Sequence, residues 1–203
     1  MRRRIFIAVN LPENIKNKLA EHQGKIEELF TPFQTEGFGS GPARWTKKDN
    51  LHVTLVFLGH LIDEELLKVL SAVKDVSLKA EPFRIVLDRI CYAPLNKKPP
   101  RMIWAIGENL ELAELQRGLE KSLLFFENEK TEGADKHRAH TTHITLARIE
   151  QWEFRRIDPE EIPVVDSDIS ISFEVNSIEV MESQLKRGGS KYFVLESFPL
   201  SNI

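Results

Sequence analysis

Residues 51–59 read Leu-His-Val-Thr-Leu-Val-Phe-Leu-Gly, and residues 142–149 read Thr-His-Ile-Thr-Leu-Ala-Arg-Ile. Each stretch contains a histidine, one apolar residue, a threonine and a leucine, first at His52 and again at His143. Such short apolar, β-branched runs predict strands. Side chains two residues apart share one face of a strand. We therefore predict two strands that each present an imidazole and a hydroxyl together.

The opposite face of each strand is apolar and is expected to pack into the core. The residues concerned are Val53, Leu55 and Phe57 in the first stretch, and Ile144 and Leu146 in the second. If the two strands lie side by side across a cleft, two imidazoles and two hydroxyls converge there.

That convergence suits the cleavage of a phosphoester. His52 and His143 titrate near neutral pH, so one can act as general base and the other as general acid. The hydroxyls of Thr54 and Thr145 can donate hydrogen bonds to phosphate oxygens as charge builds on them. A strained cyclic phosphodiester is a favourable substrate for such a site. The chemistry requires neither a metal nor another cofactor.

Two other interpretations of the histidines exist. A single His-x-Thr on an apolar strand is usually structural, and only the second copy favours a paired site. His137, His140 and His143, joined by His52, could form a metal site. However, spacing by three residues aligns ligands on a helix, whereas this stretch is expected to become a strand, and no carboxylate completes a ligand pattern. We therefore predict no metal.

The rest of the chain alternates between runs typical of strands and of helices. Strands are predicted at Ile5–Val9, Phe83–Leu87, Arg101–Ile106, Ile169–Met181 and Lys191–Leu200, and helices at Glu13–Leu29, Asp63–Val73 and Leu110–Phe126. Loops are predicted at Thr31–Ala43, Leu95–Pro100 and Glu127–Arg138, and a hairpin turn at Arg187–Ser190. Hairpin-like connections favour an α+β fold with antiparallel or mixed sheets over a doubly wound sheet. Because each half contains strand, helix and histidine strand, we predict one domain over residues 1–203, made of two similar interleaved lobes.

Composition excludes several classes of protein. The net charge is -3, so binding to a nucleic acid would need a local basic cleft. Cys91 is the only cysteine, which excludes an intrachain disulfide and a thiolate zinc cluster and fits a reducing compartment. No stretch approaches the roughly 18 apolar residues that span a bilayer, and Ile5–Val9 is too short for a signal peptide. We expect a cytoplasmic protein without membrane association, by default a monomer.

The motifs resemble those of a known family. His-x-Thr repeated twice is the signature of the 2H phosphoesterase superfamily, and the chain is most similar to its RNA 2′,3′-cyclic phosphodiesterase branch, historically called 2′-5′ RNA ligase (LigT, ThpR). Similar segments extend over nearly the whole chain: RIFIAVNLP, RWTKKDNLHVTLVFLG, PRMIWAI, HITLAR and KYFVLESFPL. One departure is Thr142, where many relatives carry proline before the second histidine.

The resemblance implies a bilobal α+β fold with pseudo-twofold symmetry, two antiparallel or mixed sheets lining a central cleft, and helices outside. It implies metal-independent hydrolysis of RNA 2′,3′-cyclic phosphate ends, on tRNA-like or other RNA, to a 2′-phosphate. In the family's usual assignment His143 would activate water and His52 would protonate the departing O3′. In reverse, a 5′-hydroxyl replaces water and a 2′-5′ linkage forms without ATP.

Arg148 coincides with the arginine of the family's HxTLxR motif, where it would contact the phosphate. Strict alternation places Arg148 on the face opposite His143, so a bulge, a strand end or a long reach is needed. A surface arginine at a strand end is the alternative.

Further basic residues precede both motifs: Arg44, Lys47, Lys48, Lys136 and Arg138. They would lie near the cleft mouth if the lobes face each other, and solvated loop charge is the alternative. Three other functions share the site: cleavage of 2′-5′ oligonucleotides, cleavage of a cyclic ADP-ribose phosphate, and non-catalytic binding of RNA or a nucleotide.

Overall fold

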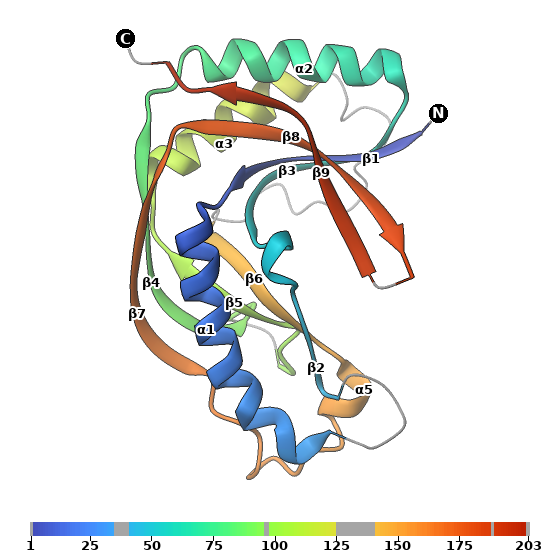
Figure 1. Cartoon of the computed structure of the whole chain (residues 1–203), viewed down its shortest axis with the longest axis vertical. Coiled ribbons are helices and arrows are strands. Elements are labelled where there is room, and N and C mark those ends of the chain that lie inside the picture. Colours follow the sequence, from blue (N-terminus) through green and yellow to red (C-terminus); the bar gives the residue numbers. More distant parts are fainter. Residues whose placement is uncertain (1, 35–40, 96–97, 125–140, 188, 202–203) are drawn as a thin grey trace.

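A computed structural model describes residues 2–34, 41–95, 98–124, 141–187 and 189–201. Its strands form two four-stranded antiparallel groups that meet edge to edge (Figure 1). The first group has the order β7 (Asp166–Val175), β4 (Phe83–Ala93), β5 (Met102–Gly107) and β6 (Thr142–Ile149). The second has the order β3 (His52–Leu61), β1 (Arg3–Asn10), β8 (Ser177–Lys186) and β9 (Gly189–Pro199). A short strand, β2 (Ala43–Trp45), pairs with β6.

The two groups join through one residue pair, Val53 of β3 opposite Ile144 of β6. Both side chains are fully buried. These are the residues that follow the two histidines in the sequence. The core beneath the joint therefore anchors both motif strands at the same place.

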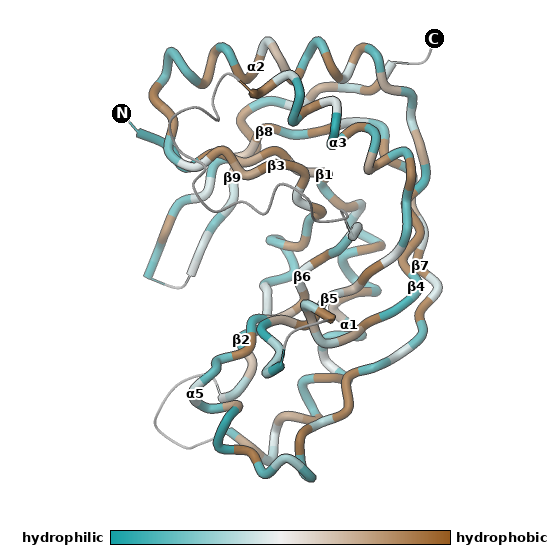
Figure 2. Tube along the Cα trace, turned by 180° about the vertical axis from the view of Figure 1, so that it is seen from behind, coloured by the Kyte–Doolittle hydropathy of each residue, from teal (hydrophilic) through white to brown (hydrophobic). Residues whose placement is uncertain are grey.

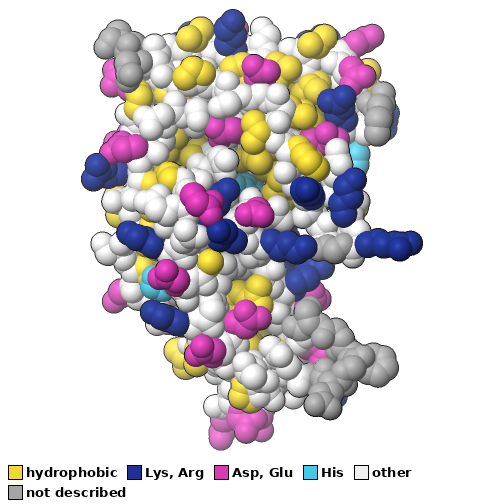
Figure 3. Space-filling view, viewed as in Figure 1, with side chains coloured by type: hydrophobic (Ala, Val, Ile, Leu, Met, Phe, Trp, Pro, Cys, Tyr) yellow, Lys and Arg dark blue, Asp and Glu magenta, His cyan; other side chains and the backbone are white. Residues whose placement is uncertain are grey.

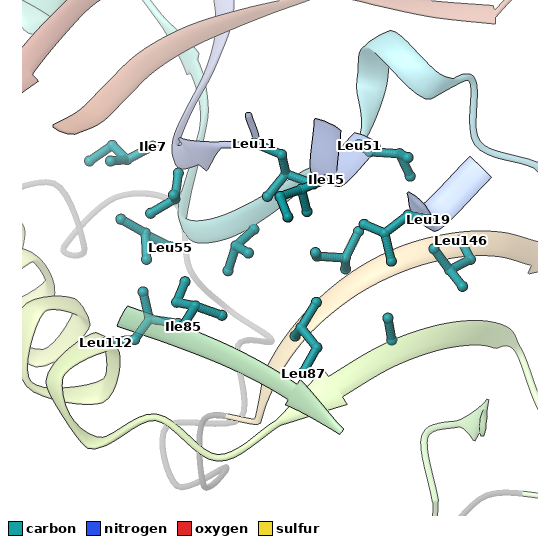
Figure 4. Close-up of a cluster of buried hydrophobic side chains, with 14 of the residues drawn as sticks. Ile7, Leu11, Ile15, Leu19, Leu51, Leu55, Ile85, Leu87, Leu112 and Leu146 are labelled. Atoms are coloured by element: carbon teal, nitrogen blue, oxygen red, sulfur yellow. The ribbon is translucent and has the colours of Figure 1, made fainter. Parts of the chain in front are cut away.

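Helices cover the sheets with the apolar faces that their periodicity predicts. They are α1 (Glu13–Phe30), α2 (Asp63–Ser77), α3 (Leu110–Leu123) and the short α5 (Gln151–Phe154). Along α2, hydrophobic and hydrophilic residues alternate in Figure 2, as expected for a helix with one face on a sheet. In the core, Leu19 of α1, Leu146 of β6, Leu112 of α3 and Leu55 of β3 belong to one buried cluster (Figure 4). Among the described residues, no helix is long and apolar enough to cross a membrane.

Most predicted elements are present within a few residues, but several differ. The predicted strand Ile169–Met181 is two strands, β7 and β8, which are separated at Asn176 and belong to different groups. The short helix α5 was not predicted. β2 was not predicted, because three residues are too few for a periodic pattern. Thr31–Phe33, expected as loop, forms a 3₁₀ turn at the end of α1. β4 continues six residues beyond the predicted end at Leu87, to Ala93. The polar pair Asp88-Arg89 suggested an end, but the strand passes through a bulge there and Arg89 binds Asp166 of β7 at 2.6 and 2.7 Å. The predicted loop Glu127–Arg138 lies outside the described residues.

Candidate active site

One cavity of about 370 Å³ opens where β3 and β6 meet. All five residues singled out by the sequence line it: His52, Thr54, His143, Thr145 and Arg148. Its volume falls within the roughly 300–1,000 Å³ typical of small-ligand sites. No aspartate or glutamate is among the described residues that line it, and Arg4 of β1 adds a second cation. Such a lining favours an anionic ligand.

The two imidazoles are held in the same way. Nδ1 of His52 lies 2.7 Å from the carbonyl oxygen of Asn50, and Nδ1 of His143 lies 2.9 Å from that of Thr141. A carbonyl oxygen only accepts, so Nδ1 carries the hydrogen in both rings. In the neutral state Nε2 of each ring is therefore the unprotonated, basic nitrogen. Nε2 of His52 lies 2.9 Å from the Thr54 hydroxyl.

Aromatic side chains distinguish the two histidines. The Trp104 indole of β5 stacks on the His143 ring, with centroids 3.9 Å apart and planes inclined by 23°. His52 has no such stack among the described residues; Phe6 meets it at a tilt and Tyr192 edge-on, at 5.1 and 5.2 Å. The sequence did not predict these three aromatic residues at the site. Alternation along β1 and β9 gives Phe6 and Tyr192 no feature that distinguishes them from core aromatic residues, and the same holds for Trp104.

Burial lowers the pKa of both histidines. For His52, removal from water is the largest cause, and the nearby His143 and Lys16 lower the pKa further against the hydrogen bond to the Asn50 carbonyl, which raises it. For His143, removal from water again lowers the pKa, opposed by the hydrogen bond to the Thr141 carbonyl. Both rings therefore tend to be neutral near pH 7. Because both rings line the same cavity, a charge on His143 disfavours a charge on His52.

A β-bulge explains how Arg148 reaches the cavity. On β6, Thr145 pairs with Trp104 and Ala147 pairs with Ile103, so Leu146 is an extra residue. Leu146 and Ala147 are both buried, and Arg148 returns to the face of His143. One extra residue inverts the alternation beyond it.

A second β-bulge makes the prediction for Phe57 wrong. On β3, Thr54 pairs with Ala8 and Val56 with Ile7, so Leu55 is the extra residue. Val53 and Leu55 are buried as predicted, but Phe57 is 67% exposed and lines the cavity instead of the core. Phe57 thus occupies in β3 the position that Arg148 occupies in β6, five residues after the histidine.

The β8–β9 hairpin covers one side of the site. Ser183, Ser190 and Tyr192 line the cavity. Asn50 donates a hydrogen bond of 2.7 Å from its side chain to the Ser190 carbonyl. Since the Asn50 carbonyl also holds His52, the hairpin is tied directly to the segment that orients this histidine. The sequence showed the hairpin turn but not its position over the motif.

Two of the three basic residues that precede the first motif are engaged elsewhere. Arg44 lies 3.6 Å from Glu150, and Lys48 binds Glu13 and Asn17. Neither they nor Lys47 line the cavity. Lys and Arg side chains nevertheless gather across the middle of the face seen in Figure 3.

Several of the predicted residues cannot be placed. Lys136, Arg138, His137 and His140 lie outside the described residues. Within the part of the chain that is described, no three His, Cys, Asp or Glu side chains cluster as metal ligands would.

The chain is similar to known proteins over most of its length. Residues 9–104 match a family model described as LigT like Phosphoesterase. The RNA 2′,3′-cyclic phosphodiesterase of Thermus thermophilus is 34% identical over 200 residues, covering 97% of this chain and 90% of that protein. The enzyme of the same name from Methanocaldococcus jannaschii is 27% identical over 195 residues, covering 96% and 99%.

Solved structures agree on the fold. The crystal structure of TT0787 from Thermus thermophilus has a TM-score of 0.77 at 30% identity and covers 97% of each chain. Escherichia coli LigT, crystallised with 3′-AMP, has a TM-score of 0.74 at 20% identity over 100% of both chains. The predicted α+β phosphoesterase fold is confirmed.

Proposed function

Because this chain belongs to the LigT-like phosphoesterase family, as its motifs predicted, we propose that it is an RNA 2′,3′-cyclic phosphodiesterase. One observation carries the proposal: two His-x-Thr strands join at Val53 and Ile144 and open onto one cavity. A hydrophobic core continuous through both sheets supports one domain of two lobes over residues 1–203.

The reaction needs one proton removed and one supplied. Water attacks the phosphorus of the terminal cyclic phosphate while a neutral histidine accepts its proton at Nε2. The P–O3′ bond breaks, and a protonated histidine donates from Nε2 to O3′, which leaves a 2′-phosphate and a 3′-hydroxyl. We assign the base to His143 and the acid to His52. With both Nδ1–H groups fixed on backbone carbonyls, each ring presents Nε2 as the reacting nitrogen.

The remaining site residues act on the phosphate. Thr54 and Thr145 donate hydrogen bonds to its non-bridging oxygens, and Arg148 supplies a cation on the same side. These groups stabilise the charge that accumulates as the phosphorus becomes five-coordinate. Reversal with an RNA 5′-hydroxyl in place of water would give a 2′-5′ linkage.

RNA is the substrate that the cavity lining and the relatives favour. Arg4 and Arg148 offer positive charge, and no carboxylate among the described lining residues repels a phosphate. A monomer in the cytoplasm completes the proposal.

The test incubates the purified protein with an RNA that ends in a 2′,3′-cyclic phosphate, in the presence of EDTA. We expect a 2′-phosphate product that is unaffected by EDTA. His52→Ala and His143→Ala should each lower turnover about 10²-fold or more. His22→Ala, on α1 and outside the cavity, serves as the matched control.

Near-normal turnover of either cavity variant would refute the two-histidine mechanism. Loss of turnover in EDTA would reinstate the metal hypothesis. Tight RNA binding without any product would indicate a binding module, and cleavage restricted to 2′-5′ oligonucleotides would reassign the substrate.

A further inference from the structure

The β-bulges in the two motif strands each leave a backbone carbonyl group that needs a hydrogen-bond donor. Each inserts an extra leucine, Leu55 in β3 and Leu146 in β6, directly after the motif threonine. A bulge disrupts the regular ladder of backbone hydrogen bonds. Both leucines are buried, so their carbonyl groups need donors from elsewhere in the protein.

A glutamine side chain donates to each of these carbonyl groups, at Leu146 together with a backbone N–H group. Gln23 of α1 donates from Nε2 to the Leu146 carbonyl at 2.8 Å and lies 2.9 Å from the Thr46 carbonyl. The Thr46 backbone N–H also donates to the Leu146 carbonyl at 2.8 Å. Gln116 of α3 donates from Nε2 to the Leu55 carbonyl at 2.7 Å. Each bulge therefore has one glutamine at the same motif position.

The pairing crosses between the halves of the molecule. Helix α1 lies between β1 and β3 in the chain, yet its glutamine binds β6; α3 lies between β5 and β6, yet its glutamine binds β3. Helix α3 also packs on β3, and Leu112 and Leu55 belong to one buried cluster (Figure 4).

The bulges decide which residue faces the substrate. Without the extra residue at Leu146, alternation would turn Arg148 away from His143, and without the one at Leu55 it would turn Phe57 away from His52. We propose that Gln23 and Gln116 are positioning residues, which hold the two bulges and thereby direct Arg148 and Phe57 into the cavity. The inference rests on the proposed function only in taking a phosphate ester as ligand.

The first test titrates inorganic phosphate into the protein and follows the His143 ring by NMR. Gln23→Met keeps the side-chain length and removes the donor. We expect Gln23→Met and Arg148→Met each to weaken phosphate binding about 10-fold, as for loss of a charge-assisted hydrogen bond. The double variant should bind no more weakly than Arg148→Met alone, because Gln23 acts through Arg148.

The matched control is Gln151→Met. Gln151 also donates to a backbone carbonyl, that of Pro100 at 2.7 Å, but it does not line the cavity. Its removal should lower the melting temperature and leave the phosphate affinity unchanged. A merely structural Gln23 would behave in the same way.

The second test uses the half-buried Gln116, which is decisive if Gln23→Met does not fold. Gln116→Met should leave phosphate affinity unchanged but weaken binding of adenosine 3′-phosphate. In a protein that already carries Phe57→Ala, Gln116→Met should not weaken that binding further. Wild-type phosphate affinity in Gln23→Met, or an equal loss with and without Arg148, would overturn the inference for α1. Additive effects of Gln116→Met and Phe57→Ala would overturn it for α3.

These outcomes separate from the proposed function. A wild-type protein that binds phosphate but does not hydrolyse cyclic phosphate ends would refute the phosphodiesterase proposal and leave the glutamine inference standing. Failure of the wild-type protein to bind phosphate would overturn the glutamine inference.

Discussion

Replacing Trp104 by leucine should lower the pKa of His143 and show which role this histidine plays. The indole covers the face of the imidazole at 3.9 Å and 23°, a geometry in which the ring face stabilises the imidazolium form. Such a contact contributes about 1 kcal/mol at a partly buried site. Since one pKa unit corresponds to about 1.4 kcal/mol, the pKa of His143 should fall by about 0.7 unit.

The assay is an NMR titration of the histidine rings together with the pH profile of kcat/KM. His52 provides an internal control, because Trp104 is not among its ring contacts, and Trp104→Phe should give a smaller shift. If His143 is the base, it must be neutral, and the rising acidic limb of the profile moves to lower pH. If it is the acid, it must be protonated, and the falling alkaline limb moves instead.

An increase in the pKa of His143 would refute this reasoning. It would mean that the indole acts chiefly by excluding water, so that leucine admits water and favours the charged ring. An equal shift of His52 would show a general disturbance of the site rather than loss of the stack.

Three further predictions concern stability. The pKa of both His52 and His143 is lowered in the folded protein, whereas unfolded histidine titrates near 6.5, so the unfolded state binds more protons below about pH 6.5. The free energy of unfolding should therefore fall as the pH drops from about 6.5 through the folded pKa values. In urea titrations, the free energy of unfolding of a His52→Gln/His143→Gln variant should depend less on pH than that of the wild type. An unchanged pH dependence would contradict this prediction. Gly107→Ala should destabilise the protein by about 3 kcal/mol or more, since its Cβ would lie 2.0 Å from the Val86 carbonyl oxygen. Gly24 lies on the exposed side of α1 with nothing within 4 Å of an added Cβ, so Gly24→Ala should instead stabilise the protein by about 0.5–1 kcal/mol. Equal melting temperatures of the two variants would refute this contrast. Glu179 is buried and accepts hydrogen bonds from the Asn10 backbone, Ser177 and Ser197, so Glu179→Leu should cost about 2–4 kcal/mol in chemical denaturation; a cost below that of an ordinary surface substitution would show that these bonds do not matter.

Local pattern was sufficient for much of the fold and of the site. The apolar alternation around His52 and His143 identified two strands, and the spacing of leucines along Leu110–Leu123 identified a helix. These patterns depend on side chains a few residues apart, so the chain itself displays them. The repeated motif also indicated that the two strands work together, and the structure brings both to one cavity.

The prediction for Phe57 failed for a reason that is not local. Period-two alternation assigns faces correctly only while every residue is paired. The extra residue at Leu55 inverts the alternation as far as Phe57, after which Leu58 is a second extra residue. The same inversion brings Arg148 to the side of His143, a placement for which the sequence required a bulge, a strand end or a long reach.

The sequence by itself determined the two histidine–threonine strands, the helices and the family, because apolar periodicity and a repeated motif lie within short segments. Only the tertiary structure decided which side chains surround the histidines: Trp104 over His143, the β8–β9 hairpin beside His52, and the glutamines that hold the bulges. Those contacts join residues as far as 123 and 140 positions apart. These residues meet because each group of strands packs against a helix from the other half of the chain. The periodicity within a single segment carries no information about such pairing.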